Sequence, residues 1–171
     1  MSANFPLEGG CGCGHIRYRM ETSPLVVHCC HCTWCQRETG TAFAINAMIE
    51  SDRITNLNGE PQMVQIPSES GRGQRVARCP KCQVAVWSHY AGSGHLTKFV
   101  RVGSLDDPDQ LPPDAHIFTE SMQSWVEIPA SMNAYPVFYE REKVWSRESL
   151  ERLAVLEPAI AAYKASLVET S

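Results

Sequence analysis

Three cysteines within six residues, in Cys30-His31-Cys32-Thr33-Trp34-Cys35, constrain this chain more than any other feature. Cys30 and Cys32 lie two positions apart, and on an extended strand that spacing points both side chains to the same face. Cys35 follows after two residues, the gap that a tight turn needs to bring a third sulfur to the same point. Soft thiolates that converge in this way favour zinc over hard cations such as magnesium or calcium. These three residues, the three-sulfur set, therefore predict a zinc site.

The number of ligands in the three-sulfur set indicates which kind of zinc site it forms. A structural zinc usually has four protein ligands, whereas a catalytic zinc keeps one position open for water or substrate. Three sulfurs therefore indicate an open, reactive zinc. A closed site remains the alternative if Cys29, His28, His31 or a distant histidine supplies a fourth ligand. His31 points to the opposite face of the strand if both of its neighbours bind.

A second group of cysteines has the spacing of a closed site. Cys11 and Cys13 form a Cys-x-Cys pair among glycines, and Cys79 and Cys82 form a Cys-x-x-Cys pair far along the chain. Four thiolates suit a structural zinc that joins the N-terminal strand to a hairpin in the middle of the chain. The binding free energy at such a site is folding free energy. This four-sulfur set and the three-sulfur set together predict two zinc ions per chain.

Two other uses of the cysteines fit the sequence less well. A disulfide framework is typical of secreted proteins, and the first residues carry neither the basic nor the apolar region of a secretory signal. Cys79-Pro80-Lys81-Cys82 resembles a thioredoxin-type redox pair, but that motif needs a helix after its first cysteine. Residues 83–87 instead predict a strand. We therefore expect a reducing, cytoplasmic setting in which these cysteines bind metal.

Short apolar runs predict a chain built mainly of β-strands. Apolar and polar residues alternate in 16–20, and further strands are predicted at 25–27, 43–49, 63–66, 75–78, 84–87 and 96–102. Residues 36–39 can form one helical turn that Gly40 ends, and residues 56–60 predict a turn. From His116 to Phe138 the sequence predicts irregular structure.

The last part of the chain differs in kind from the strand-rich part. Apolar residues recur at helical spacing in 150–154 and again in 160–167. Pro158 is unfavourable in the middle of a helix and favourable in its first turn. We therefore expect two short helices, or one kinked at Pro158, in a C-terminal extension (144–171) packed on a zinc-binding domain (1–143). The apolar stripe of this extension leaves a homodimer contact open.

Charge and hydropathy narrow the choice of partner. The formal net charge is -4, which gives no general attraction for nucleic acid. Arg72, Arg75 and Arg78 are closely spaced, but no aromatic residues interleave with them as a stacking surface for bases needs. No apolar run is long enough to span a bilayer. A small molecule is therefore the expected partner, and neither nucleic acid nor a membrane is.

Taken together, the motifs resemble those of a known family. They are Gly10-Cys11-x-Cys13-Gly14, then Cys30-His31-Cys32-x-x-Cys35-Gln36-Arg37-x-x-Gly40-x-x-Phe43, then Cys79-Pro80-x-Cys82. Gly103-x-Leu105-Asp106-Asp107-Pro108, His116-Ile117 and Ser124-Trp125 follow in the same order. Over roughly residues 9–140 the chain is similar to the glutathione-dependent formaldehyde-activating enzyme and centromere protein V family.

The resemblance implies a fold, two metal sites and an activity. The fold is mostly β, of the β-tent kind, with small antiparallel sheets around zinc. A structural zinc is implied on Cys11, Cys13, Cys79 and Cys82, and a catalytic zinc on Cys30, Cys32 and Cys35. The activity is that of a carbon–sulfur lyase, which forms and cleaves S-hydroxymethylglutathione from glutathione and formaldehyde.

Candidate substrate contacts follow from the chemistry of glutathione, which carries two carboxylates. Arg72, together with Arg75 and Arg78, is a candidate to bind them, helped by Ser70 and the backbone of Gly71. The resemblance adds His116 as a residue of the pocket wall, with Trp34 and Trp125 as further candidates.

Three departures from the family pattern bear on the substrate. Gln83 stands where the family often has glycine, and the helical extension is additional. Residues 132–136, Met-Asn-Ala-Tyr-Pro, stand where the family has a more acidic ending of the Leu-Pro type. The alternative function is a zinc-stabilised binding module without catalysis, as a centromere-associated relative suggests.

Overall fold

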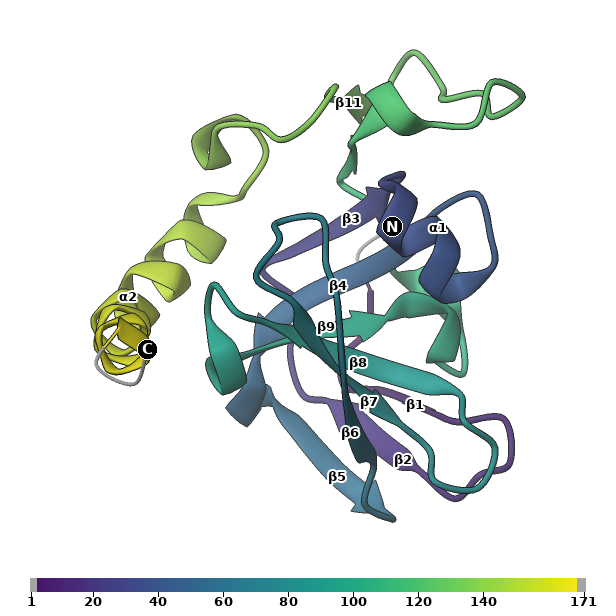
Figure 1. Ribbon diagram of the computed structural model, residues 1–171, viewed down its shortest axis with the longest axis vertical. Helices are drawn as coiled ribbons and strands as arrows, with labels where there is room; N and C mark the ends of the chain where they lie inside the picture. Colours follow the sequence, from purple (N-terminus) through teal and green to yellow (C-terminus); the bar gives the residue numbers. More distant parts are fainter. Residues whose placement is uncertain (1–2, 169–171) are drawn as a thin grey trace.

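Two β-sheets and two α-helices form the computed structural model, which describes residues 3–168 (Figure 1). The smaller sheet is antiparallel and has the order β1 (Leu7–Gly10), β2 (Arg17–Met20), β5 (Ile54–Asn58). The larger sheet has eight strands, in the order β11 (Asn133–Ala134), β10 (Ala115–Ile117), β3 (Val26–Cys30), β4 (Ala44–Glu50), β9 (Thr97–Arg101), β8 (Ala85–Tyr90), β7 (Gln74–Arg78), β6 (Gln62–Ile66). The prediction of a mainly β fold with a C-terminal helical extension is confirmed.

The helices lie at the edges of this β structure. Helix α1 (Thr33–Thr39) follows β3 directly, and Gly40 ends it in the left-handed conformation with φ 70°. Helix α2 (Arg147–Val168) ends the described part of the chain. Six short 3-10 turns complete the described structure: η1 (Ser51–Arg53), η2 (Gly94–Leu96), η3 (Val102–Ser104), η4 (Pro108–Gln110), η5 (Thr119–Ser121) and η6 (Arg141–Lys143).

The main core lies between the two sheets. Tyr18 and Met20 of β2 are fully buried there, against Ala47 and Ile49 of β4. The Tyr18 ring meets Trp87 edge to face, with ring centroids 5.7 Å apart. Because side chains alternate along a strand, the neighbours of these core residues point to the other face of the large sheet.

That other face of the large sheet carries the candidate site. Strand register places His28 of β3 beside Asn46 of β4, and Asn46 beside Arg101 of β9. Met48 pairs with Phe99 in the same way. All five side chains therefore belong to the face turned away from the small sheet.

One continuous helix replaces the two short helices that Pro158 suggested. Helix α2 continues through Pro158, which lacks the N–H that would bond to the carbonyl of Ala154. Ala154 is exposed to solvent, so water can satisfy that carbonyl. Residues 169–171 of the predicted extension lie outside the described residues. No helix within residues 3–168 combines the length and the apolar character needed to cross a membrane.

Helix α2 is attached to the sheet structure at two distant points. Leu153 is buried against Leu25 and Val26 at the start of β3. Near the other end of the helix, the Tyr163 ring covers Gly94 so closely that a Cβ atom at Gly94 would lie 2.3 Å from it. The extension therefore packs along the edge of the β structure (Figure 1).

Two regions differ from the predicted secondary structure. Residues 54–58 form strand β5, although a turn was predicted for 56–60. The strand forms through its pairing with β2, and only its first residue is buried. The region from His116 to Phe138 is largely irregular, as predicted, but contains β11 and the end of β10. Both strands are very short and depend on pairing with a distant segment.

Candidate metal centres and adjoining cavity

The structure brings the four-sulfur set together from opposite ends of the strand-rich part. Cys11 and Cys13 follow β1, and Cys79 and Cys82 lie in the turn between β7 and β8. The Sγ atoms of Cys11 and Cys13 are 3.5 Å apart, those of Cys13 and Cys79 are 3.7 Å apart, and all four lie within 4.8 Å of one another. A tetrahedron of sulfurs about 2.3 Å from zinc has edges of about 3.8 Å. The geometry therefore fits a tetrahedral ion of this size.

Backbone N–H groups also favour the ionised form of these thiols. The N–H of Ile16 donates to Cys11 Sγ at 3.2 Å, and the N–H of Lys81 donates to Cys79 Sγ at 3.4 Å. Burial acts to raise the pKa of Cys11, but the Ile16 N–H and the neighbouring thiols outweigh it and lower this pKa to about 6. The set can therefore hold a metal cation.

Gln83 shows why its position favours glycine. Its φ of 61° is in the left-handed region, where residues with a Cβ are uncommon. Its N–H donates to the carbonyl of Cys79 at 2.9 Å, and its side-chain amide donates to the carbonyl of Pro80 at 3.3 Å. The departure from the family pattern therefore leaves the turn around the cysteines closed.

The three-sulfur set gathers where β3 meets α1. Cys30 ends β3, Cys32 caps the N-terminus of α1, and Cys35 lies in its first turn. The N–H of Cys35 donates to Cys32 Sγ at 3.4 Å, and the three sulfurs lie within 4.8 Å of one another. All three side chains are buried. This group could hold a metal ion with three protein ligands.

The thiols of the three-sulfur set share their protons unequally. Hydrogen bonds from Cys30 and Cys35 lower the pKa of Cys32 to about 3. The hydrogen bonds with Cys32 and Cys35, and burial, raise the pKa of Cys30. One proton therefore leaves easily and the others are held, unless a cation compensates the charge. A divalent metal supplies that compensation.

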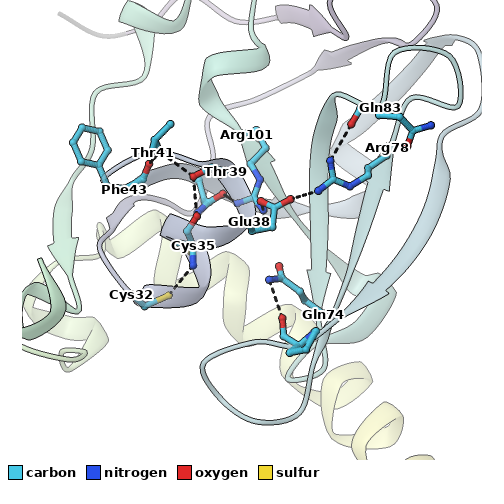
Figure 2. Close-up of polar contacts among 12 residues, drawn as sticks. Cys32, Cys35, Glu38, Thr39, Thr41, Phe43, Gln74, Arg78, Gln83 and Arg101 are labelled. Atoms are coloured by element: carbon cyan, nitrogen blue, oxygen red, sulfur yellow. Dashed lines mark hydrogen bonds and ion pairs between the residues drawn. The ribbon is translucent and has the colours of Figure 1, made fainter. Parts of the chain in front are cut away.

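An ion-pair network holds α1, and with it Cys32 and Cys35, against the sheet (Figure 2). The Glu38 carboxylate accepts from Arg78 of β7 at 2.5 Å and from Arg101 of β9 at 2.8 Å, and its side chain is only 6% exposed. Arg101 also donates to the side-chain oxygen of Asn46. The network therefore ties α1 to two strands of the large sheet, β7 and β9, which lie on either side of β8.

A cavity of about 530 Å³ adjoins the three-sulfur set. Its floor is the outer face of the large sheet, with His28, Asn46, Met48, Gln74, Tyr90 and Phe99. Other parts of the chain line the cavity around this floor. They are the three cysteines with Trp34, the 67–73 loop, Gly92 and Ser93, and the segment at the end of β10 and after it. The remaining wall comes from the C-terminal part of the chain, through Phe138, Arg141, Trp145, Leu153, Ile160 and Lys164.

The predicted carboxylate-binding residues are only partly brought to this cavity. Ser70 and Arg72 line it. Gly71 lies at the tip of the same loop, but its N–H donates to the carbonyl of Ser68 at 2.9 Å and so is already used. Arg78 is paired with Glu38, and Arg75 lines a smaller neighbouring cavity of about 270 Å³.

His116 and Trp125 do not line the cavity, so their predicted place in its wall is corrected. The parallel pairing of β10 with β3 sets His116 beside Cys29, whose side chain alternates with that of Cys30. His116 is therefore buried on the opposite side of the strand. Trp125 is 69% exposed and donates to Gln123. Trp34 does line the cavity.

Cys29, His31 and His116 form a further cluster of metal-ligating residue types that sequence reasoning left unassigned. His31 Nε2 and His116 Nδ1 are 2.9 Å apart, and the ring centroids are 5.2 Å apart. The centroid separation equals the nitrogen distance plus the two ring radii, so the nitrogens face each other in line. Their lone pairs do not converge on a shared point, and the pair is best described as an N–H···N hydrogen bond.

Comparison with known proteins now places the chain. The model of the family "Glutathione-dependent formaldehyde-activating enzyme" matches residues 6–121, and the chain belongs to this family. A Halomonas elongata protein named "Putative glutathione-dependent formaldehyde-activating enzyme" is 27% identical over 127 residues, which cover 71% of this chain and 80% of that protein. A crystal structure of a Rhodobacter sphaeroides protein shares 19% identity with a TM-score of 0.45, over 58% of this chain and 88% of that one.

Sequence reasoning missed the part of the cavity wall that comes from the C-terminal extension. Leu153, Ile160 and Lys164 lie on one face of α2, and the apolar spacing of this helix was the available signal. That spacing predicts a buried face but does not indicate that the face borders a site.

Proposed function

We propose that the protein is a zinc-dependent enzyme of the carbon–sulfur lyase type, acting on the adduct of a glutathione-class thiol with an aldehyde. The observation that supports this most directly is that three buried, convergent sulfurs line a cavity large enough for a ligand. The four-sulfur set already has its four ligands, so we assign it the structural role. The three-sulfur set is then the reactive centre.

Two zinc ions per chain follow from this assignment. Cys11, Cys13, Cys79 and Cys82 would hold the structural ion, and Cys30, Cys32 and Cys35 the catalytic one. Zinc bound by three thiolates has a net charge near -1, which suits it to hold a further sulfur as thiolate better than to activate water. The open position would face the cavity.

The chain's own residues supply binding and orientation. Arg72 lies at the cavity without an ion-pair partner within residues 3–168, and suits a carboxylate of the thiol. Gln74 also lines this cavity, and its side chain is buried. An unpaired cation at the cavity favours a thiol that carries a free carboxylate.

The reaction balances without a redox partner. In one direction the thiol sulfur bonds to the aldehyde carbon and the carbonyl oxygen takes a proton, which gives a hemithioacetal. In the other direction the carbon–sulfur bond breaks, the sulfur keeps the electron pair, and the hydroxyl proton leaves as the carbonyl forms. Holding thiol and aldehyde side by side accounts for much of the acceleration.

The setting proposed for the enzyme is a reducing one, such as the cytoplasm, which keeps eight thiols free of disulfides. We divide the chain into a zinc-binding domain (1–143) and an extension (144–171) that completes the cavity. No observation in the described residues favours the binding-module alternative over catalysis.

Calorimetric titration of reduced glutathione into zinc-loaded protein tests the proposal, with S-methylglutathione as the paired ligand. We expect glutathione to bind at least tenfold more tightly, because only the free thiol can reach the metal. Cys32→Ser should abolish that preference and reduce turnover at least a hundredfold. Cys29→Ser, on the opposite face of β3, is the matched control. Equal binding of the two ligands to the wild type would refute the metal–thiol contact.

A further inference from the structure

Part of the cavity belongs to this chain's extension and lies outside the family-matched region. The family model ends at residue 121, whereas one wall of the cavity comes from residues 138–164, most of which belong to the extension. Residues there touch the same cavity as Cys30, Cys32 and Cys35. What they select is therefore determined by residues outside the family-matched region.

The added wall is held firmly in place. The Tyr139 hydroxyl is hydrogen-bonded to His28 of β3, and Trp145 Nε1 donates to the same hydroxyl at 3.1 Å. Farther along, Arg152 forms two hydrogen bonds with the buried carboxylate of Glu50, at 2.8 and 2.6 Å. These contacts fix the wall near Trp145 and near Leu153.

The wall is apolar next to the three-sulfur set. Trp145, Leu153 and Ile160 form one apolar cluster together with Met48 of the sheet floor. Tyr139 packs against this cluster and also against the cluster that contains the three cysteines. Ile117 and Phe118 of the cysteine cluster also line the cavity, so apolar side chains border it both near the sulfurs and beside α2. A ligand group placed beside a metal-bound sulfur would contact hydrocarbon there, and its burial is favourable.

The size of the cavity exceeds what a one-carbon aldehyde needs. Formaldehyde occupies about the volume of a water molecule, roughly 30 Å³. The cavity holds about 530 Å³ and extends along the apolar wall to α2. A glutathione-class thiol takes part of this volume, and the apolar stretch beside α2 suits an aldehyde with a larger apolar group.

The charges around the cavity suit an anionic thiol. Lys164 of α2 and Arg72 of the 67–73 loop both line the cavity, and neither has an ion-pair partner within residues 3–168. Arg141 also lines it and meets Glu157 at 3.8 Å, where both side chains are exposed. Glu69 is the acidic lining residue. Because Arg141 is paired, Arg72 and Lys164 are the two cations that can meet carboxylates of a ligand, and they favour an anionic thiol.

From these observations we infer that the extension makes this a site for adducts between an anionic thiol and an aldehyde that carries a sizeable apolar group. The inference rests on the proposed function and names its aldehyde class. The reaction is the same reversible addition, in which the aldehyde's apolar chain lies along Trp145, Leu153 and Ile160. Ile160 is then a specificity-determining residue.

A comparison of two aldehydes tests the inference. The catalysed rate with glutathione is measured for formaldehyde and for hexanal, each relative to its uncatalysed reaction, with zinc-loaded protein. Each buried methylene favours binding about fourfold. We therefore expect kcat/KM for hexanal to exceed that for formaldehyde at least tenfold. Ile160→Ser should lower the hexanal value about tenfold and leave the formaldehyde value within twofold.

Val155→Ser is the matched control, because Val155 is on the same helix and 81% exposed. It should change neither value, and melting temperatures show whether each variant is folded. Turnover of formaldehyde but not hexanal by the wild type, or equal loss of both in Ile160→Ser, would overturn the aldehyde class and leave the proposed function standing. No turnover of either aldehyde would overturn the proposed function and this inference with it. The wild-type comparison needs no variant to fold.

Discussion

The four-sulfur set and the three-sulfur set contain the same chemical group in opposite surroundings. Cys13 is exposed, Cys82 is half-buried, and the four-sulfur set borders neither of the two cavities described. The three-sulfur set is buried throughout, yet it lines a cavity of about 530 Å³. Cys11 and Cys79 of the four-sulfur set are buried as well. In the proposed assignment, ligand number and access to a cavity would therefore separate the structural from the reactive centre, and burial of the cysteines would not.

The largest effect should come from breaking the four-sulfur set. Cys79→Ser removes a fully buried ligand that joins the N-terminal strand to the β7–β8 turn. We expect the free energy of unfolding to fall by at least about 4 kcal/mol, because metal binding at this set is folding energy. Chemical denaturation with zinc analysis measures it.

Cys32→Ser, in the three-sulfur set, is the matched comparison for Cys79→Ser. We expect it to remain folded and to keep one zinc ion, at the four-sulfur set. A similar loss of stability in both variants would contradict the division into a structural and a reactive set.

Arg101→Met should weaken the three-sulfur set selectively. Arg101 holds Glu38 of α1 and lies close enough to Cys35 to favour its thiolate form. Its loss should lower zinc affinity at this set by about 10- to 100-fold. Competition with a chromophoric chelator resolves the two sets.

The control for that variant is Arg17→Met, which breaks a surface pair with Asp106. It should leave both zinc affinities unchanged. Weakening of the four-sulfur set by Arg101→Met would mean that the two sets are coupled.

Acid should empty the two sets in a fixed order. The hydrogen bond with Cys30 lowers the pKa of Cys35, but the hydrogen bond with Cys32 and burial outweigh it and leave this pKa raised to about 12, and the pKa of Cys30 is raised as well. In the four-sulfur set the pKa of Cys13 is raised to about 11, whereas those of Cys82 and Cys11 are lowered. Two of the three ligands in the three-sulfur set thus regain protons readily as pH falls, and a metal with three protein ligands should leave about one pH unit before one with four.

Zinc release followed during acid titration, with the Cys32→Ser variant to identify the phases, measures this order. The first phase should be missing in that variant. Loss of the other phase would reverse the assignment.

The smallest expected effect concerns Arg72, which lines the cavity beside the three-sulfur set and also the smaller cavity. Arg72→Gln should raise the KM for glutathione about fivefold and leave kcat unchanged, since a carboxylate contact of about 1 kcal/mol is lost. Arg75→Gln, which changes an arginine beside the smaller cavity, should not alter KM. Steady-state kinetics measures KM and kcat for both variants. An equal rise in KM in both would show that surface charge causes the effect, and not a contact of Arg72 with the substrate.

The sequence predicted those parts of the candidate site whose geometry depends on a few adjacent residues. Cys30, Cys32 and Cys35 converge because two residues of strand spacing are followed by one helical turn, and Gly40 ends that turn as expected. The spacing also grouped the four-sulfur set correctly in space. In both cases a few adjacent residues fix where the sulfurs point.

Features that depend on distant pairing could not be predicted in this way. The position of His116 follows from the parallel register of β10 with β3, to which its own neighbours give no clue. The role of the extension likewise depends on which face of the large sheet it meets. Ile160 and Lys164 show helical spacing in the sequence, but only docking of α2 brings them to the cavity.

The contact between Gly94 and Tyr163 has a consequence for how this chain can vary over evolution. Any side chain at position 94 would collide with the aromatic ring and displace the end of α2. Relatives that carry a comparable helix should therefore keep a glycine here whenever the helix presents an aromatic residue, and the two positions should change together. Relatives without the helix are free of this restriction, so a bulkier residue at position 94 marks chains whose cavity has a different wall.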